Sequence, residues 1–413
     1  MKLLYIVDGR SPIATNWISY FILKGHEIHL VSTFPCQPII GLASFKVIPM
    51  GLSGVYAQPE VRSSTLGNLV RRVVPVELRT WFRQLVTPFS FSQAANTLRN
   101  EIDRIQPDLV HAMRIPYEGM IASLAMEKIS QRSEYANKIC LLISVWGNDF
   151  TLHARSTRAI AEHTRRTLKY CDALHTDCQR DLNLAREFDF ISIKPSIVLP
   201  GGGGVKLDVF YPAEPSLETI DRHFGEGDSP ILIINPRGFR AYVRNDTFFR
   251  SIPLVLNKFP QVRFVCPGMA DEALAMKWIS ELGISENVEL LPSQTNQEMA
   301  KLFRQSKISV SITTHDGTPN TLLEAMASGC FPIAGDLESL REWITPGVNG
   351  FLVDPGDPNA LALAIHEAID QPGLRKKARE YNLRVVKEKA EYDMVMQAAN
   401  EFYFRLVSTN SHK

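Results

Sequence analysis

Short apolar runs alternate with longer helical patterns along this 413-residue chain, and this alternation constrains its fold more than any other feature. The runs are about four to eight residues long, rich in β-branched residues and bounded by turn residues, which is typical of strands inside a parallel sheet. Those of the first half are KLLYIVD (2–8), HEIHLVS (26–32), DLVHAM (108–113), CLLISVWG (140–147) and DALHTD (172–177). Those of the second half are ILIINP (231–236), VRFVCPG (262–268), VELLPS (288–293), ISVSIT (308–313), FPIAG (331–335) and GFLVDP (350–355). Helical patterns separate them in both halves, so the sequence predicts an α/β fold of two doubly wound, Rossmann-like domains facing across a cleft.

Four consecutive glycines divide the two halves, in VLPGGGGVKLDVF (198–210). Glycines in such number are costly inside a helix or strand, so residues 201–204 are expected to form a turn or hinge. The sequence therefore predicts an N-terminal domain over 1–204 and a C-terminal domain over 205–387. A last amphipathic stretch predicts a helix over 388–407 that packs back on the first domain.

Composition excludes some partners and leaves others open. The formal net charge is +1, so a nucleic acid is not expected as a partner, and no stretch approaches the ~18 apolar residues of a membrane span. The six cysteines are scattered singly, without the spacing of a zinc site or disulfide framework, which favours reduced thiols and a cytoplasmic location. Region 59–90 is basic and amphipathic. It is expected either to make a peripheral contact with a membrane or an anionic acceptor, or to cover the first sheet with its arginines in water.

The stretch HDGTPNTLLEAMASGC (315–330) is expected to carry a ligand-binding helix. It follows a predicted strand through a turn at Gly317, with Thr318 as a plausible N-cap and Pro319 at the first helical position. The helix then begins at the carboxyl end of a strand, where open α/β sheets bind ligands. The amides of Asn320 and Thr321 can donate to a phosphate, supported by the helix dipole.

Two carboxylates flank the start of this predicted helix. Glu324 lies about one and a half turns inside it and suits a neutral diol such as a ribose, and Asp316 precedes the turn and can accept from a sugar hydroxyl. The alternative is a solvated acidic pair beside an amphipathic surface helix.

These residues resemble the signature of family 4 glycosyltransferases, in which Glu, seven residues and Glu are followed by Ala-Met-Ala-x-Gly. Here Asp316, seven residues and Glu324 are followed by AMASG, and the resemblance extends over 346–365 and 198–210. It implies the GT-B fold, a nucleotide-sugar donor with UDP or GDP, and retention of configuration. It also implies that the first acid binds donor-sugar hydroxyls and the second binds the ribose. Asp in place of Glu at the first position is one methylene shorter, which leaves donor identity open.

The resemblance also assigns an arginine-rich loop, NPRGFRAYVRND (235–246). Members of the family neutralise the leaving diphosphate there with an Arg and a Lys about six residues later. Arg237 fits the first position and Arg244 stands near the second, with Arg240 between them. A guanidinium binds diphosphate bidentately, so arginine in place of lysine is chemically sensible. The alternative is three arginines on a surface loop.

Three further positions are expected to approach the donor through their backbone. Gly268 ends a predicted strand, and Pro292 lies where the family's backbone reads the base edge. Gly9 follows the first predicted strand and would let the backbone approach the donor phosphate.

The resemblance also implies a histidine beside the donor sugar, after the predicted strand 108–113. The family often shows His-x-His after this strand, and here the pattern is His111-x-Met113. Two interpretations stay open: His111 takes part through a shifted loop, or it is a buried structural histidine.

Acceptor contacts are expected from the same domain. Arg114, Tyr117 and Glu118 follow His111 closely and are candidates. SVWGNDF (144–150) resembles a family turn that reads His-Gly-x-Asp, with Trp146 replacing the histidine and Asp149 retained.

Together these residues predict a retaining hexosyltransferase in which Arg237, Arg244 and the helix start stabilise the departing diphosphate. The resemblance implies a same-face reaction in which the departing phosphate oxygen takes the acceptor's proton. No Asp-x-Asp motif is visible, so neither a metal nor another cofactor is expected. The acceptor is expected to be a sugar, a lipid or a small molecule. A nucleotide-sugar epimerase on the same fold and an inactive sugar-nucleotide-binding protein stay open as alternatives.

Overall fold

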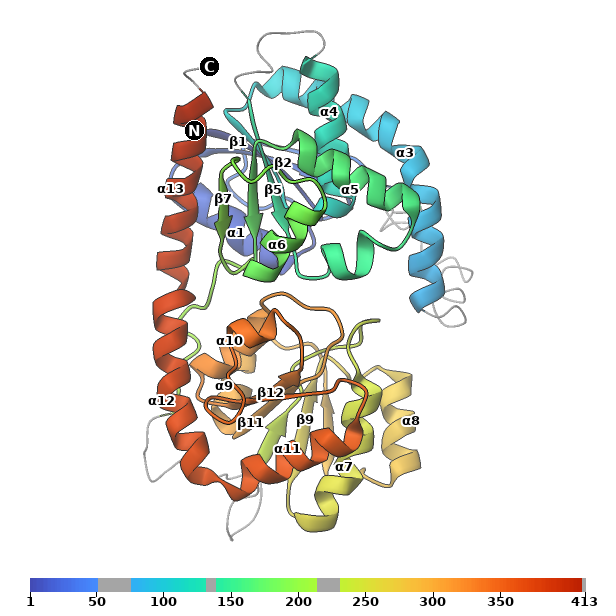
Figure 1. The fold of residues 1–413 in the computed structure, drawn as a ribbon, viewed down its shortest axis with the longest axis vertical. Coiled ribbons are helices and arrows are strands. Elements are labelled where there is room, and N and C mark those ends of the chain that lie inside the picture. The colour runs from blue at the N-terminus through green and yellow to red at the C-terminus, as the bar shows by residue number, and fades with distance from the viewer. Residues whose placement is uncertain (51–75, 131–138, 214–230, 411–413) are drawn as a thin grey trace. The chain divides into compact units, whose positions relative to one another are not determined.

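The computed structural model describes residues 1–50, 76–130, 139–213 and 231–410, with the backbone alone for 76–90 and 410. The chain forms two compact units (Figure 1), one of Met1–Gly203 with Met394–Lys413 and the other of Gly204–Asp393. The expected basic region 59–90 falls on residues 59–75, which lie outside the described residues, and on the start of a helix whose side chains are not described there.

The first unit contains a parallel sheet of seven strands among the described residues, in the order β3-β2-β1-β4-β5-β6-β7. The strands are β1 Lys2–Val7, β2 Glu27–Ser32, β3 Ser44–Val47, β4 Leu109–Ala112, β5 Cys140–Val145, β6 Ala173–Thr176 and β7 Ser196–Val198. The five strands predicted in this half are confirmed. They are almost wholly buried, as expected of apolar strands covered by helices on both faces.

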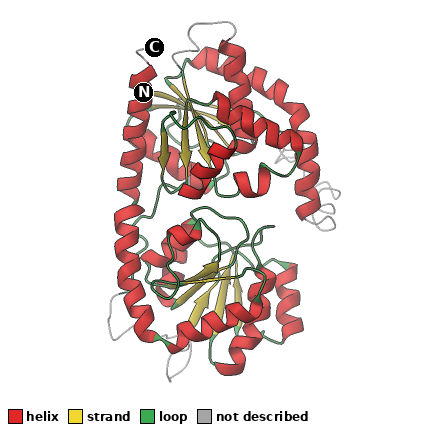
Figure 2. Cartoon of the chain, viewed as in Figure 1, coloured by secondary structure: helices red, strands yellow, loops and turns green. Residues whose placement is uncertain are grey.

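Helices cover both faces of this sheet (Figure 2). They are α1 Pro12–Leu23, α3 Val76–Ile105, α4 Met120–Ser130, α5 Arg158–Tyr170, α6 Gln179–Glu187 and the C-terminal α13 Tyr392–Asn410. α13 returns to this unit from the second one, and its Tyr403 is buried against Phe21 of α1, with ring centroids 4.5 Å apart.

The second unit contains a parallel sheet of six strands in the described residues, in the order β10-β9-β8-β11-β12-β13. The strands are β8 Leu232–Ile234, β9 Arg263–Pro267, β10 Val288–Leu291, β11 Ile308–Ser311, β12 Phe331–Gly335 and β13 Phe351–Val353. The helices are α7 Asn245–Lys258, α8 Ala273–Leu282, α9 Asn296–Gln305, α10 Asn320–Ala327, α11 Pro358–Asp370 and α12 Pro372–Lys389. Strand order reverses between β8 and β11, so the residues after these two strands are those that a doubly wound fold presents to a ligand.

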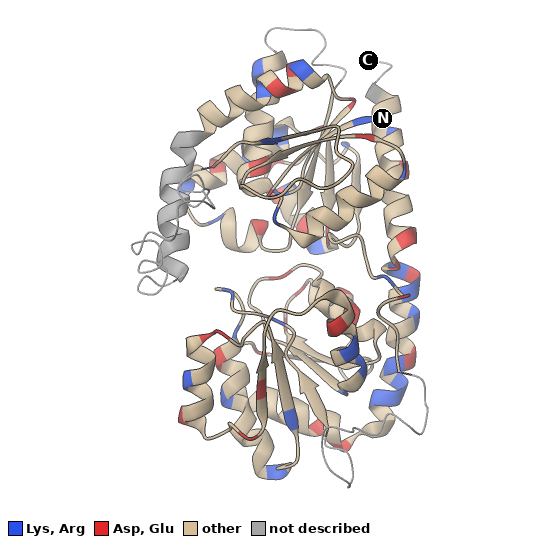
Figure 3. Ribbon diagram, turned by 180° about the vertical axis from the view of Figure 1, so that it is seen from behind, with Lys and Arg blue, Asp and Glu red and all other residues tan. Residues whose placement is uncertain are grey.

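Charges of both signs are scattered over the helices and loops of each unit (Figure 3), in line with the net charge of +1. Within the described residues, no helix combines the length and the apolarity needed to span a bilayer. All six cysteines are free, and five of them are buried.

Candidate functional site

The expected ligand-binding helix is α10, which follows β11 through the loop 312–319. Its N-cap is Pro319, and Asn320 is the first helical residue, so the predicted assignment of Thr318 as N-cap and Pro319 as first helical residue is wrong by one position. The Thr318 hydroxyl accepts a hydrogen bond from Trp343 Nε1 at 3.0 Å. Since Pro319 supplies no side-chain cap, the amides of the first turn, at Asn320 and Thr321, are left for another acceptor.

Arg237 contacts two of the other predicted donor residues. Its Nη2 lies 2.9 Å from Asp316 Oδ2, and its Nη1 donates to Thr321 Oγ1 at 3.4 Å. The side chains of Arg237 and Asp316 are only 12% and 15% exposed, so the ion pair is largely shielded from water. The Arg237 backbone N–H donates to Asn235 Oδ1, which holds the start of the loop. The structure thus brings Arg237, Asp316 and the first turn of α10 together.

Glu324 also lies near the charge of Arg237, as the fifth residue of α10 and about one turn from its start. Burial raises the pKa of its carboxyl from an ordinary 4.5 to about 7, although the positive charge of Arg237 acts to lower it. Burial disfavours the charged form, and a single guanidinium shared with Asp316 does not compensate for that. The carboxyl is therefore poised to change protonation near neutral pH.

Arg244 makes a different set of contacts. Its guanidinium forms a bidentate ion pair with Asp246, with Nε–Oδ1 and Nη2–Oδ2 distances of 2.8 Å each. The negative charge of Asp354 also acts to raise the pKa of Arg244. An antiparallel bridge between Val243 and Thr313 holds its loop against the chain that leaves β11. The loop is therefore placed as the sequence predicts, while the Arg244 side chain is directed to the start of α7.

Gly268 and Pro292 come together at the carboxyl ends of β9 and β10. The Gly268 N–H donates to the Pro292 carbonyl at 3.1 Å, and Gly268 has φ +75°, a conformation that favours glycine. Pro292 is exposed, whereas Gly317 and Pro319 are buried in the loop before α10.

Gly9, in the first unit, follows β1. Its N–H donates to Ser32 Oγ at 3.0 Å, and a Cβ at this position would lie 2.4 Å from Cys36 Sγ. The glycine is thus explained by close packing against the end of β2.

His111 is a buried structural histidine, the second of the two interpretations left open by the sequence. It is 0% exposed, and its Nδ1 and Nε2 are hydrogen-bonded to Tyr403 Oη at 2.5 Å and Ser144 Oγ at 2.7 Å. Ser144 continues the chain to His175 Nδ1 at 2.8 Å. Burial and the neighbouring His175 lower the pKa of His111 well below its usual value, so it is neutral. Both ring nitrogens are engaged inside the unit, and the predicted contact with a donor sugar is not supported.

Arg114 and Asp149 form an internal ion pair. Arg114 Nη2 lies 2.9 Å from Asp149 Oδ1, while Asp149 Oδ2 accepts from the backbone N–H groups of Ile115 and Trp146 at 3.1 Å each. Asp149 is 1% exposed, and burial raises its pKa in spite of these partners. The pair fixes two loops that follow β4 and β5, so these two acceptor candidates have structural partners.

The other two acceptor candidates lie between β4 and α4. Glu118 is 2% exposed, accepts from Thr33 Oγ1 at 2.6 Å, and has a pKa raised by burial. Tyr117 has φ +71°, which is unusual for a residue other than glycine, and it packs against Phe91. Strain of this kind clusters at functional sites. Tyr117 therefore stays a candidate.

Two residues that were not predicted as site residues position the loop before α10. Ser339 Oγ donates to the Asp316 carbonyl at 2.7 Å, and Trp343 donates to Thr318 as described above. Both follow α10 and return to it only through the tertiary fold, so no local pattern identifies them.

Two other polar groupings in the first unit contain none of the predicted donor or acceptor residues. Asp177, Cys178 and Asp181 have potential metal-ligand atoms within 4.8 Å of one another. Arg180 Nη2, however, lies 2.7 Å from Asp181 Oδ1, and burial raises the pKa of Cys178, which keeps it a neutral thiol.

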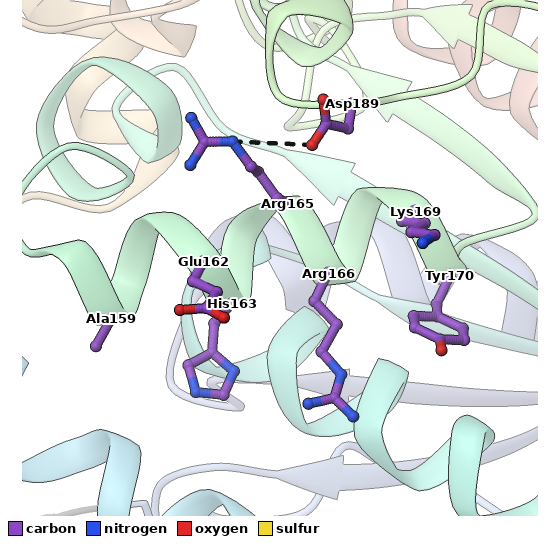
Figure 4. A pocket seen from close by; sticks show the side chains of 8 residues that line it. All are labelled: Ala159, Glu162, His163, Arg165, Arg166, Lys169, Tyr170 and Asp189. Atoms are coloured by element: carbon purple, nitrogen blue, oxygen red, sulfur yellow. Dashed lines mark ion pairs between the residues drawn. The ribbon is translucent and has the colours of Figure 1, made fainter.

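A surface pocket of about 500 Å³ lies along α5 (Figure 4). It is lined mainly by charged side chains, among which Arg165 pairs with Asp189 and Arg166 pairs with Glu127. Its arginines are thus matched by neighbouring acids, and none of the predicted donor or acceptor residues line it.

Comparison with known proteins places both units in one class. Residues 2–177 match the glycosyl transferase 4-like model and residues 218–385 match the model of glycosyl transferases group 1. The putative glycosyltransferase EpsD of Bacillus subtilis is 26% identical over 289 residues, which cover 68% of this chain and 72% of EpsD. The D-inositol 3-phosphate glycosyltransferase of Thermobispora bispora is 27% identical over 179 residues, and the match spans only 41% of each protein.

Solved structures agree on the architecture. Sucrose-phosphate synthase from Thermosynechococcus elongatus superimposes with a TM-score of 0.73 at 14% identity, covering 99% of this chain and 100% of that one. HepE from Anabaena, in complex with UDP, has a TM-score of 0.67 at 14% identity, with 97% and 99% covered. At such identities the likeness shows the fold, which confirms the predicted pair of Rossmann-like domains. The chain belongs to the group 1 glycosyltransferases of the GT4 type and has the GT-B fold.

Proposed function

We propose that this glycosyltransferase moves a hexose, with retention of configuration, from a UDP- or GDP-sugar to an acceptor hydroxyl. The observation that carries the proposal is the position of Arg237, whose guanidinium lies between Asp316 and Thr321 at the first turn of α10. A guanidinium next to the amides of a helix N-terminus suits a departing diphosphate. HepE was solved with UDP, which makes UDP the first nucleotide to test.

Four of the predicted donor-side residues have roles in this proposal. Glu324 accepts from the ribose hydroxyls, Asp316 accepts from the transferred sugar, and Arg237 neutralises the diphosphate as charge develops on it. Arg244 joins Arg237 only after releasing Asp246. As the bond from the anomeric carbon to the diphosphate breaks, the acceptor oxygen bonds to that carbon on the same face. The departing phosphate oxygen takes the acceptor's proton, so no protein base is required.

Cofactor, acceptor and location belong to the same proposal. Arg237 and the start of α10 supply positive charge at the diphosphate, so we propose a reaction without a divalent metal. Turnover that persists in excess EDTA would support this, and its loss and recovery with Mg²⁺ or Mn²⁺ would overturn it. We further propose a cytoplasmic enzyme acting on a sugar, lipid or small-molecule acceptor, with a peripheral membrane contact through 59–90. Co-sedimentation with anionic but not neutral vesicles tests the membrane contact.

The central experiment is a donor assay with the purified full-length chain. Release of nucleotide diphosphate with a product that keeps the anomeric configuration of the donor, followed by NMR, is the expected result. Arg237→Gln should lower turnover by about 10²–10³-fold, the size of effect seen for one stabilising group at a developing charge. Arg240→Gln, on the same loop but exposed, is the matched control and should change turnover little. An epimerised nucleotide sugar, or tight binding without turnover on any donor, would instead support the epimerase or the inactive binding protein.

A further inference from the structure

Two groups with separate roles in donor binding are bonded to each other. Arg237, proposed for the diphosphate, and Asp316, proposed for the sugar, form an ion pair with a 2.9 Å distance between Nη2 and Oδ2. A guanidinium satisfied by a carboxylate is not free to bind a diphosphate in the same geometry. The pair therefore has a direct consequence for how a nucleotide enters and leaves.

The surroundings hold the backbones of both partners in place. Asn235 accepts from the Arg237 N–H, and its own side chain donates to Asn245 Oδ1 at 3.1 Å. On the other side, Ser339 Oγ donates to the Asp316 carbonyl. Since both backbones are anchored, the ion pair can open by side-chain rotation without a movement of either loop.

Charge balance favours an exchange of partners over simultaneous binding. Asp316 pairs with Arg237, and the carboxyl of Glu324 lies close enough for the charge of Arg237 to act on its pKa. A diphosphate bound beside the intact Arg237–Asp316 pair would contact one guanidinium that already lies near two acidic side chains, Asp316 and Glu324. Like charges in a shielded site repel strongly, so a diphosphate at Arg237 displaces Asp316.

We infer that Asp316 competes with the donor's diphosphate for Arg237, and that the nature of the ligand decides which of the two wins. This inference rests on the proposed function. An intact nucleotide sugar offers hydroxyls to the displaced carboxylate, so Asp316 keeps a hydrogen-bonding partner. The nucleotide diphosphate left after transfer has lost the sugar hydroxyls and keeps only those of the ribose, which are assigned to Glu324, so Asp316 returns to Arg237. The site thereby selects donor over product and promotes product release.

The test compares Asp316→Asn with the wild-type chain by calorimetry, using UDP, UDP-glucose, GDP and GDP-mannose as probes. Asparagine keeps the shape and removes the charge. The variant should bind the matching nucleotide diphosphate about tenfold more tightly, because a charge-assisted, shielded pair no longer has to open. It should bind the nucleotide sugar no more tightly than the wild type does. Product inhibition by the nucleotide diphosphate should strengthen by the same factor.

Asp336→Asn is the matched control. Asp336 also pairs with an arginine of the second unit, Arg341, but in an exposed position. Asp336→Asn should leave the affinities for the nucleotide diphosphate and the nucleotide sugar within about twofold of the wild-type values, because exposed ion pairs contribute little. The double variant Asp316→Asn with Arg237→Gln should lose the gain, because the two changes act on one contact and are not additive.

The outcomes separate this inference from the function on which it depends. A wild-type chain that binds neither nucleotide nor nucleotide sugar would overturn the proposed function. A wild-type chain that binds them, with an Asp316→Asn variant that binds the nucleotide diphosphate equally or more weakly, would overturn the inference alone and make Asp316 a residue that orients Arg237. If Asp316→Asn bound the nucleotide diphosphate and the nucleotide sugar more tightly than the wild type by the same factor, the selection of donor over product would be overturned.

Discussion

Replacement of Glu324 by glutamine tests how the burial of one carboxyl in α10 couples stability to pH. The pKa of Glu324 is raised from an ordinary 4.5 to about 7 in the folded chain. Because the folded pKa lies above the unfolded one, the stabilisation from this group is complete below pH 4.5 and is lost as the pH rises through 7. At about 1.4 kcal/mol per pH unit, the free energy of unfolding that depends on Glu324 falls by about 3 kcal/mol over that interval.

Glutamine has the same shape as glutamate and does not titrate. The free energy of unfolding of the Glu324→Gln variant therefore lacks this pH-dependent contribution. Melting of the wild type and Glu324→Gln should be followed by circular dichroism at pH 5, 6, 7 and 8. The melting temperature of the variant minus that of the wild type should therefore increase by about 6–12 °C from pH 5 to pH 8. This range follows from ~2–4 °C per kcal/mol for a unit of this size. Saturating UDP should shift the wild-type transition to lower pH, because hydrogen bonds from the ribose favour the ionised carboxylate.

Glu281→Gln is the control for this series. Glu281 is a glutamate of α8 in an exposed ion pair with Lys277, with its side chain 58% exposed. Its difference from the wild type should stay small at every pH. If Glu324→Gln also kept a constant difference in melting temperature from pH 5 to pH 8, the burial argument would be refuted.

Three further predictions concern the scaffold around the two sheets. Tyr403→Phe removes the hydroxyl bonded to His111 Nδ1 and should lower the free energy of unfolding by about 1–3 kcal/mol, measured by urea denaturation with Tyr392→Phe as control. The pKa of His175 is lowered to about 4 by burial, so the stabilisation from this group is present above pH 6.5 and lost as the pH falls through 4. In melts over a pH series, His175→Gln should therefore reduce the fall in melting temperature between pH 6.5 and 4. An unchanged fall would contradict the lowered pKa of His175. Gly335→Ala places a Cβ 2.5 Å from the Thr313 carbonyl and should cost about 1–3 kcal/mol in the same denaturation assay, and an unaffected midpoint would show that the end of β12 can move aside.

Local patterns were enough to predict most elements of the fold and the position of α10. Strand and helix periodicity depends on neighbours within a few residues, and among the described residues it located five of the seven strands of the first sheet and all six of the second. The exact start of α10 was missed by one residue, because the Thr318 hydroxyl bonds to Trp343 of a later segment. A pairing between segments so far apart in the chain leaves no mark on local sequence.

The roles of individual side chains were harder to predict, because burial and pairing decide them. His111 lies near the end of β4, where an active-site histidine could lie, yet its ring bonds to Tyr403, 292 positions away. Arg244 was expected beside Arg237, but it pairs with Asp246 at the start of α7. In both cases the residue type was compatible with two roles, and the choice depended on which neighbours the fold supplied.

The sequence by itself determined the α/β class, the division at the glycines, and the spacing of Asp316 and Glu324 around the start of a helix. These properties follow from the chemistry of residues near one another in the chain. Only the tertiary structure decided that Asp316 pairs with Arg237, 79 positions away, and that burial brings the pKa of Glu324 to about 7. Ion pairing and desolvation depend on distances in space, which the parallel sheet sets by placing the ends of β8 and β11 side by side.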